Sequence, residues 1–254
     1  MIKAIVFDLD GTLYVGNAPI AGVKEKLVEF RKQGKKVLFL TNSATRSRAN
    51  LLEKINTMGF GSKKDEVYSS SYLLANYIAE KYPQKTVFVV GETGIAEECQ
   101  NSGITIVDQK ADIVVVGLDR TLTYEKLAKA LGCLNNGAIL IGANSDPTYP
   151  TETGLKPGAG SIIAAIECAS GKKAHIVGKP NIYALEIIEK EHGLKANEIL
   201  VVGDRLGTDI KFANDCGAKS ALVLSGVSKK EDIKEIKPNY ILDSVLDIQT
   251  QHLI

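Results

Sequence analysis

The sequence predicts an α/β fold in which a parallel sheet is flanked by helices. Short β-branched runs alternate with amphipathic helical stretches along the 254 residues, and this alternation is typical of parallel sheets. Glycines follow several of the helical stretches, where a left-handed C-terminal cap costs least. The strand candidates outnumber those expected in one sheet, and a chain of this length can form two domains.

The first two strand and helix pairs can be followed in order. The run AIVF at 4–7 precedes a helical stretch near 22–32, and KVLFL at 36–40 precedes one near 46–58. The expected cap glycines are Gly34, Gly59, Gly103, Gly193 and Gly217. Further strand candidates are TVFVV at 86–90, ITIV at 104–107, DIVVVG at 112–117, AILIG at 138–142, AHIVG at 174–178, EILVVG at 198–203 and SALVLSG at 220–226. They have no fixed period, so a repeat protein is not indicated.

Composition and charge argue against several classes of function. The chain has 31 Lys and Arg against 30 Asp and Glu, without a basic block suited to nucleic acid or a membrane surface. Its four cysteines lack zinc-site spacing and are expected to be reduced. A signal-peptide pattern and an apolar run of about 20 residues are both missing. We therefore expect a cytoplasmic protein with a small soluble substrate. A homodimer is compatible with the sequence.

The first strand ends in two carboxylates, in the segment IVFDLDGTLY. Residues i and i+2 of a strand point to the same side, so Asp8 and Asp10 are expected to form a pair. Gly11 allows the backbone to turn sharply and to approach a ligand. Isolated aspartates at such a position usually cap a strand or start a turn, but two close carboxylates need a cation, and hard oxygen ligands suit Mg²⁺.

Three further strand ends carry polar residues. KVLFL is followed by Thr41 and Asn42, AHIVG by Lys179, and EILVVG by Asp204. In parallel α/β sheets, ligands bind at the carboxyl ends of the strands, and the free amides of helix N-termini bind phosphate. These four segments therefore predict one site that binds a metal ion and a phosphate group.

The motifs together resemble those of the haloacid dehalogenase superfamily: DLDGT at 8–12, Thr41, Lys179 and GDRLGTD at 203–209. The segments LTNSATRSR, NSDPTYPTETGLKPGAGS, IIAAIECASGKK, VGKPN and LVLSGVS resemble more closely its type IIA cap phosphatases, the NagD-like, para-nitrophenyl phosphate and phosphoglycolate phosphatase group. The resemblance covers nearly the whole chain. It implies a Rossmann-like core at 1–71 and 174–254 and an inserted α/β cap domain at 72–173, which would account for the surplus strands.

The resemblance and the residue chemistry predict an Mg²⁺-dependent phosphatase. Its substrate is expected to be a small phosphate monoester: a sugar phosphate, phosphoglycolate, a nucleotide or a similar ester. Asp8 is expected to attack phosphorus and form an aspartyl-phosphate, and Asp10 to protonate the leaving alcohol and then deprotonate water. Asp8, the backbone carbonyl of Asp10, and Asp204 are expected to hold Mg²⁺, with Asp209 orienting them.

The expected phosphate ligands are Gly11, Thr41, Asn42 and Lys179. Family members often have a second asparagine after the motif threonine, whereas Ser43 and Ala44 follow Asn42 here. Two alternatives stay open. A phosphotransferase or phosphomutase would use the same core, and a binding module would keep the fold without the reaction.

The stretch from 143 to 161 is long and rich in Pro, Gly and Thr. Loops of this length are usually functional or disordered. The resemblance places this loop in the cap, facing the active site. Its Asp146, Tyr149 and Lys156 are then expected to contact the organic part of the substrate.

Overall fold

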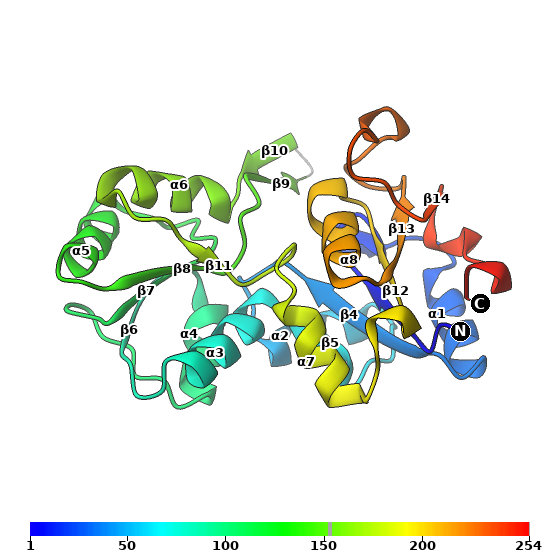
Figure 1. Cartoon of the computed structure of the whole chain (residues 1–254), viewed down its shortest axis with the longest axis horizontal. Helices are drawn as coiled ribbons and strands as arrows, with labels where there is room; N and C mark the ends of the chain where they lie inside the picture. The colour runs from blue at the N-terminus through cyan, green and yellow to red at the C-terminus, as the bar shows by residue number, and fades with distance from the viewer. Residues whose placement is uncertain (152–153, 254) are drawn as a thin grey trace. The chain divides into compact units, whose positions relative to one another are not determined.

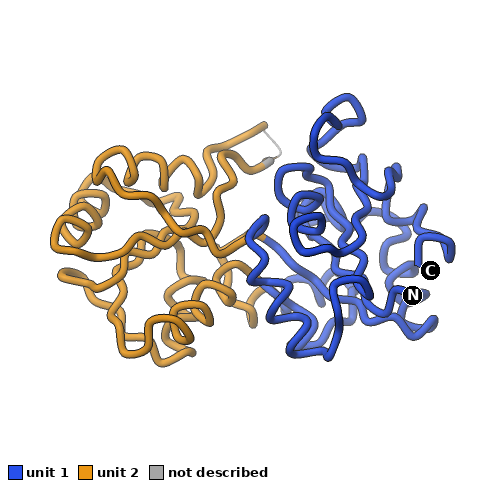
Figure 2. Tube along the Cα trace, viewed as in Figure 1, with its two compact units in different colours: residues 1–41, 52–68, 179–254 blue, residues 42–51, 69–178 orange. Residues whose placement is uncertain are grey.

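The computed structural model describes residues 1–151 and 154–253. The chain forms two compact units, coloured separately in Figure 2. Unit 1 consists of 1–41, 52–68 and the chain from 179 onward, and unit 2 consists of 42–51 and 69–178. Unit 2 thus contains the expected insert, 72–173, together with 42–51, 69–71 and 174–178.

Unit 1 is built around a six-stranded sheet with the order β14-β13-β12-β1-β4-β5 (Figure 1). The strands are β1 (Ala4–Phe7), β4 (Lys36–Thr41), β5 (Val67–Ser69), β12 (Ile199–Gly203), β13 (Lys219–Val223) and β14 (Tyr240–Leu242). β1 pairs in parallel with both β4 and β12. The chain proceeds from β1 toward one edge through β4 and β5, and later from β12 toward the other edge. The sheet therefore has its topological switch point between β1 and β12.

The helices of this part of the chain are α1 (Val23–Lys32), α2 (Arg48–Thr57), α7 (Tyr183–His192), a π-helical turn η3 (Leu206–Ile210) and α8 (Lys211–Cys216). α1 packs against β4, and α8 packs against β13. β1 is entirely buried, as expected of a central strand covered on both faces. The rings of Phe7 and Phe30 lie 5.9 Å apart and join β1 to α1. A short hairpin, β2 (Tyr14–Val15) with β3 (Ala18–Pro19), follows β1. Short 3₁₀ turns occur at Lys64–Glu66 (η1), Ala196–Glu198 (η2), Lys230–Asp232 (η4), Val245–Asp247 (η5) and Thr250–Leu253 (η6).

Unit 2 is built around a four-stranded parallel sheet with the order β11-β8-β7-β6. Its strands are β6 (Val87–Val90), β7 (Ile113–Val116), β8 (Ile139–Gly142) and β11 (His175–Ile176), and its helices are α3 (Ser70–Lys81), α4 (Thr93–Asn101), α5 (Tyr124–Asn135) and α6 (Ala159–Ser170). α5 and α6 pack against β7 over a buried apolar cluster that includes Val114, Leu134 and Ile163. α3 and α4 pack together.

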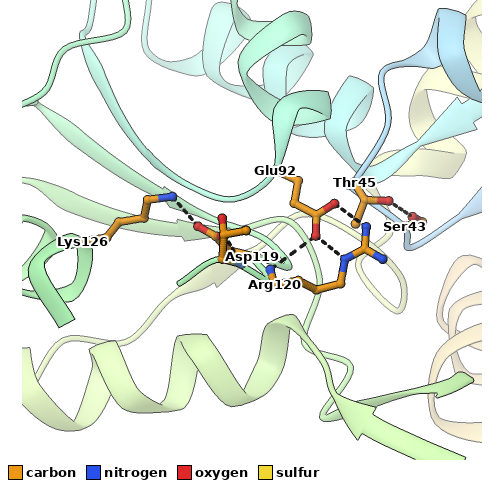
Figure 3. Close-up of polar contacts among 7 residues, drawn as sticks. Ser43, Thr45, Glu92, Asp119, Arg120 and Lys126 are labelled. Carbon is orange, nitrogen blue, oxygen red and sulfur yellow. Dashed lines mark hydrogen bonds and ion pairs between the residues drawn. The ribbon is translucent and has the colours of Figure 1, made fainter. Parts of the chain in front are cut away.

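Ion pairs join the segments that follow β6 and β7 in unit 2 (Figure 3). Arg120 Nε and Nη2 lie 2.6 and 2.7 Å from the two carboxylate oxygens of Glu92. Asp119 is buried, and it accepts hydrogen bonds from Lys126 and Thr121. The Glu92 bonds raise the pKa of Arg120, and the nearby Tyr149 raises it further. Two loops at the carboxyl edge of this sheet are thereby held in place.

The predicted fold class is confirmed, and the expected glycine caps all have positive φ, between 64° and 83°. Two local predictions are wrong. ITIV at 104–107 forms a single bridge, Ile106 to Val87, because only two backbone hydrogen bonds join it to the edge strand β6. The expected long loop contains the antiparallel strands β9 (Thr148–Thr151) and β10 (Gly154–Pro157), while its residues 152 and 153 lie outside the described ones. Among the described residues, every helix is too short or too polar to cross a bilayer.

Candidate active site

The carboxyl ends of β1 and β12 bring Asp8 and Asp204 to the switch point of the unit 1 sheet. Phe7 pairs with Val202 in parallel register, and the Asp8 amide donates to the Val202 carbonyl at 2.8 Å. Each aspartate directly follows the buried end of its strand. In open α/β sheets, ligands bind in the crevice at this point. The sheet topology therefore places two acidic side chains where a ligand is expected.

Lys179 lies between two of the acidic residues. Its Nζ is 2.7 Å from Asp8 Oδ1 and 2.6 Å from Asp209 Oδ1, and it also donates to the Leu40 carbonyl at 2.9 Å. The lysine side chain is 2% exposed. A buried ammonium is tolerated when it is paired and hydrogen-bonded, as it is here.

Asp209 is held in place on both sides. Its Oδ1 accepts from Lys179, and its Oδ2 accepts from the Arg205 backbone amide at 3.0 Å. A Cβ on Gly203 would lie 2.3 Å from the Asp209 Cγ atom, so glycine is required for this approach. The Asp209 side chain therefore packs directly against the backbone of Gly203, the last residue of β12.

A loop between β13 and β14 holds Asp204. The Val227 amide donates to Asp204 Oδ2 at 2.7 Å, and a Cβ on Gly226 would lie 2.0 Å from the same oxygen. Asp204 Oδ1 is buried and has no hydrogen-bond partner among the described residues. One oxygen of this carboxylate is thus fixed by the backbone, and the other is left for a ligand.

The chain turns sharply between Asp8 and Tyr14. Gly11 has φ 85°, and a Cβ there would lie 2.6 Å from Asp204 Oδ2, so glycine satisfies both the backbone and the space. The Gly11 amide donates to the Tyr14 carbonyl at 2.8 Å. Tyr14 Oη then donates to Asp10 Oδ2 at 3.0 Å. The turn folds the tyrosine back onto the second aspartate of the DLDGT motif.

Burial and mutual repulsion determine the electrostatics of the cluster. Burial raises the pKa of Asp8, although the Lys179 ammonium opposes this effect. Burial, and then the charge of Asp209, raise the pKa of Asp204 to about 6. Burial alone would lower the pKa of Lys179, but the Asp209 and Asp8 carboxylates outweigh it and raise the pKa. The three carboxylates carry more negative charge than one lysine can neutralise.

An oxygen from each of Asp8, Asp204 and Asp209 lies within 4.8 Å of the others. Such a group of acidic oxygens is suited to a hard cation. Asp209 uses both of its oxygens for Lys179 and Arg205, whereas Asp204 has a buried oxygen without a partner. Direct coordination is therefore expected from Asp8 and Asp204 rather than from Asp209.

The other predicted residues fall in both units. Gly11, Thr41 and Lys179 belong to unit 1, whereas Asn42 is the first residue of unit 2. Thr41 is the last residue of β4 and is buried. The Asn42 amide donates to Asp146 Oδ2 at 3.2 Å. Asn42 thus contacts a residue of the segment for which a role in substrate selection is expected.

Sequence reasoning missed two side chains around Asp10. Tyr14 is almost completely buried, and the Nζ of Lys54 on α2 lies 4.2 Å from the centre of its ring. Strand periodicity gives no sign of these contacts, because they depend on the turn at Gly11 and on how α2 packs. The tyrosine at the end of the motif was the one available signal.

Two family models match the chain. Residues 5–105 match the model described as haloacid dehalogenase-like hydrolase, and residues 176–248 match one described as HAD-hydrolase-like. The chain is 34% identical to the 5'-nucleotidase YutF of Bacillus subtilis, covering 96% of each chain. It is 36% identical to an acid sugar phosphatase of Staphylococcus aureus, covering 94% of this chain and 93% of the relative.

Solved structures agree with these matches. A p-nitrophenyl phosphatase from Archaeoglobus fulgidus superposes with a TM-score of 0.91 at 34% identity, covering 97% of both chains. NagD from Escherichia coli K-12 superposes with a TM-score of 0.89 at 31% identity, covering 98% of both. The chain therefore belongs to the haloacid dehalogenase-like hydrolases, and the predicted resemblance to the NagD and p-nitrophenyl phosphatase group is confirmed.

Proposed function

We propose that this protein hydrolyses small phosphate monoesters through an aspartyl-phosphate formed on Asp8. The class of activity follows from the family and from relatives named as phosphatases and a nucleotidase: the chain is a phosphoric monoester hydrolase. The observation that carries the mechanism is the contact of Lys179 with Asp8 and Asp209 beside the partnerless oxygen of Asp204.

The acidic cluster fits Mg²⁺. Asp8 and Asp204 offer carboxylate oxygens, and burial, followed in size for Asp204 by the charge of Asp209, raises the pKa of both groups. We assign the backbone carbonyl of Asp10 as a further ligand, and Asp209 as the residue that orients Lys179. When bound, the ion neutralises charge on the phosphoryl oxygens and permits one anion to approach another.

The first chemical step transfers the phosphoryl group to the protein. An oxygen of Asp8 forms a bond to phosphorus while the bond from phosphorus to the ester oxygen breaks. The carboxyl group of Asp10 gives its proton to that departing oxygen, so the leaving group is released as an alcohol. The protein around Asp10 desolvates its carboxyl group and raises its pKa, which favours the protonated form that this step needs.

The second step returns the protein to its starting state. Water bonds to phosphorus and gives a proton to the Asp10 carboxylate, while the bond from phosphorus to the Asp8 oxygen breaks. Inorganic phosphate leaves, Asp8 is ionised and Asp10 is protonated, as at the start. Lys179 holds Asp8 in place in both steps. Thr41, Asn42 and Gly11 are proposed, with Lys179, to bind the phosphoryl oxygens.

The names of the relatives indicate which classes of ester to test as substrates. One is named a 5'-nucleotidase and another an acid sugar phosphatase, so we propose nucleoside monophosphates and sugar phosphates as the first esters to test, with phosphoglycolate beside them. Each combines a phosphate monoester with a polar alcohol. If the phosphoryl group is transferred to water rather than to a second alcohol, one inorganic phosphate is released for each ester consumed.

The test is phosphate release from a panel of these esters and p-nitrophenyl phosphate, with and without Mg²⁺. We expect the Asp8→Asn variant to lose the activity, because an amide is a poor nucleophile. We expect Asp10→Asn to slow phosphorylation more for a phenyl ester than for the p-nitrophenyl ester, because a good leaving group needs less protonation. Wild-type turnover by Asp8→Asn would refute the mechanism.

A further inference from the structure

Tyr14 and Asp10 form a partly buried hydrogen bond for which the proposed function assigns no role. Tyr14 Oη donates to Asp10 Oδ2 at 3.0 Å, and the tyrosine is 1% exposed. Part of the surface of Asp10 is exposed, so it can exchange protons with an ester and with water, although the surrounding protein limits the hydration of its carboxyl group. The rigid side chain of Tyr14 therefore contacts the carboxyl group of Asp10, which needs a defined orientation to transfer a proton.

The local backbone fixes this contact. The Tyr14 amide donates to the Leu9 carbonyl at 3.3 Å, and the Gly11 amide donates to the Tyr14 carbonyl at 2.8 Å. Asp10 and Tyr14 also form a β-bridge. The phenol thus reaches Asp10 across a closed turn, and the tyrosine has little freedom to move away.

Lys54 fixes the ring from its face. Its Nζ lies 4.2 Å from the centre of the Tyr14 ring, where the face of an aromatic ring attracts a cation. A cation there also polarises the phenol, so that the O–H group becomes a stronger donor. Lys54 on α2 therefore contacts the ring of Tyr14, and Tyr14 in turn contacts Asp10.

We propose that Tyr14, with Lys54 on its ring, is a positioning residue that determines which oxygen of Asp10 exchanges the proton. This inference rests on the proposed role of Asp10. Because Oδ2 accepts the phenol hydrogen, the proton given to the leaving group is carried on Oδ1. Without the phenol, the carboxyl group can rotate, and the proton is correctly placed in fewer molecules.

The test compares aryl phosphates of similar size and graded leaving groups: p-nitrophenyl, phenyl and p-methoxyphenyl phosphate. Rates of phosphorylation are measured in single turnovers at saturating Mg²⁺. We expect Tyr14→Phe to reduce the rate for phenyl phosphate about tenfold more than for p-nitrophenyl phosphate, as loss of a hydrogen bond to an ionisable group would. Lys54→Met should change the ratio in the same direction by a smaller factor.

A double variant separates positioning from a structural role. If Tyr14 acts only through Asp10, then adding Tyr14→Phe to Asp10→Asn leaves the ratio between the esters as it is in Asp10→Asn alone. The matched control is Tyr68→Phe. It removes the hydroxyl group of another buried tyrosine of unit 1, which forms hydrogen bonds with Glu191 and His192. We expect it to keep the wild-type ratio.

Three results would overturn the inference. They are wild-type ratios in both Tyr14→Phe and Lys54→Met, equal losses for all three esters, or a further change of ratio when Tyr14→Phe is added to Asp10→Asn. The Asp10→Asn variant keeps the two proposals apart. If it alone leaves the ratio unchanged, the role of Asp10 itself is wrong. If it changes the ratio while Tyr14→Phe and Lys54→Met do not, only the inference fails.

Discussion

Lys179 Nζ lies 2.7 Å from Asp8 Oδ1, although the two residues are 171 positions apart in the chain. The same ammonium group contacts Asp209 at 2.6 Å. One buried cation thus joins the end of β1 to the π-helical turn after β12. The same side chain therefore links distant segments of unit 1 and contacts the proposed nucleophile.

Replacing Lys179 with Met should therefore affect both stability and activity. Breaking a buried ion pair leaves uncompensated charge, which typically costs about 3 kcal/mol or more. We expect a lower free energy of unfolding in EDTA and loss of phosphatase activity. Urea denaturation of Lys179→Met and of Lys179→Met/Asp209→Asn checks the cause. The second variant should regain part of the stability but none of the activity, and equal stabilities would contradict the role of repulsion.

Gly226→Ala should weaken the proposed metal site. The added methyl group would lie 2.0 Å from Asp204 Oδ2, so that the carboxylate must move. We expect the Mg²⁺ concentration needed for half-maximal activity to rise about tenfold, as when a residue that orients a metal ligand is lost. Gly132→Ala on α5 is the control, because a Cβ there meets nothing within 4 Å. An unchanged Mg²⁺ dependence in Gly226→Ala would argue against Asp204 as a ligand.

Alanine substitutions at Asp146 and Tyr149 should change the relative kcat/KM values among phosphate esters. Asp146 accepts a hydrogen bond from Asn42, and Tyr149 lies beside Arg120, so both occupy defined positions in unit 2. We expect little change in Mg²⁺ dependence or in inhibition by free phosphate, because the proposed metal ligands, and all the proposed phosphate ligands except Asn42, belong to unit 1. A uniform loss across all esters would show that these residues do not select the substrate.

Asp112 should make the stability of unit 2 sensitive to acid. Hydrogen bonds from the Thr86 backbone, and then from Lys85 and the Thr86 side chain, lower the pKa of Asp112 to about 2. A carboxylate with a lowered pKa stabilises the folded state above its unfolded pKa, near 4, and loses this contribution as pH falls toward 2. The melting temperature of Asp112→Asn should be below that of the wild type at pH 6, and the gap should narrow between pH 4 and pH 3. A gap independent of pH would refute this.

The elements that could be predicted are those whose signals are local. The run KVLFL forms the buried strand β4, as its composition predicts. Gly34 and Gly217 lie just after helices in the left-handed conformation that favours glycine. Asp8 and Asp204 follow the neighbouring strands β1 and β12, so the topology of the unit 1 sheet brings them to one edge. Lys179 follows β11 of the unit 2 sheet, and its side chain makes the contact with Asp8. Here sequence periodicity and three-dimensional structure carry the same information.

The rest depends on contacts that periodicity does not encode. The run ITIV is apolar enough for a strand, but it lies beside the edge strand β6 and makes only one bridge. The hairpin of β9 and β10 lies in a stretch rich in Pro and Gly, a composition that predicts turns rather than strands. Lys54 reaches Tyr14 from a helix about forty positions away, and only the packing of α2 determines that contact.

The segment 42–51 has a consequence for exchanging parts between related enzymes. A Cβ on Gly94 would lie within 2.6 Å of the Arg46 backbone, and the buried Glu98 carboxylate accepts from the Arg48 amide. The fold of unit 2 therefore includes ten residues that precede its main segment and are separated from it by seventeen residues of unit 1. A chimaera made by transplanting 72–173 alone would leave α4 facing a foreign backbone. A graft that preserves these contacts must carry two pieces of chain, joined at four places, and two of those junctions are next to Thr41 and Lys179.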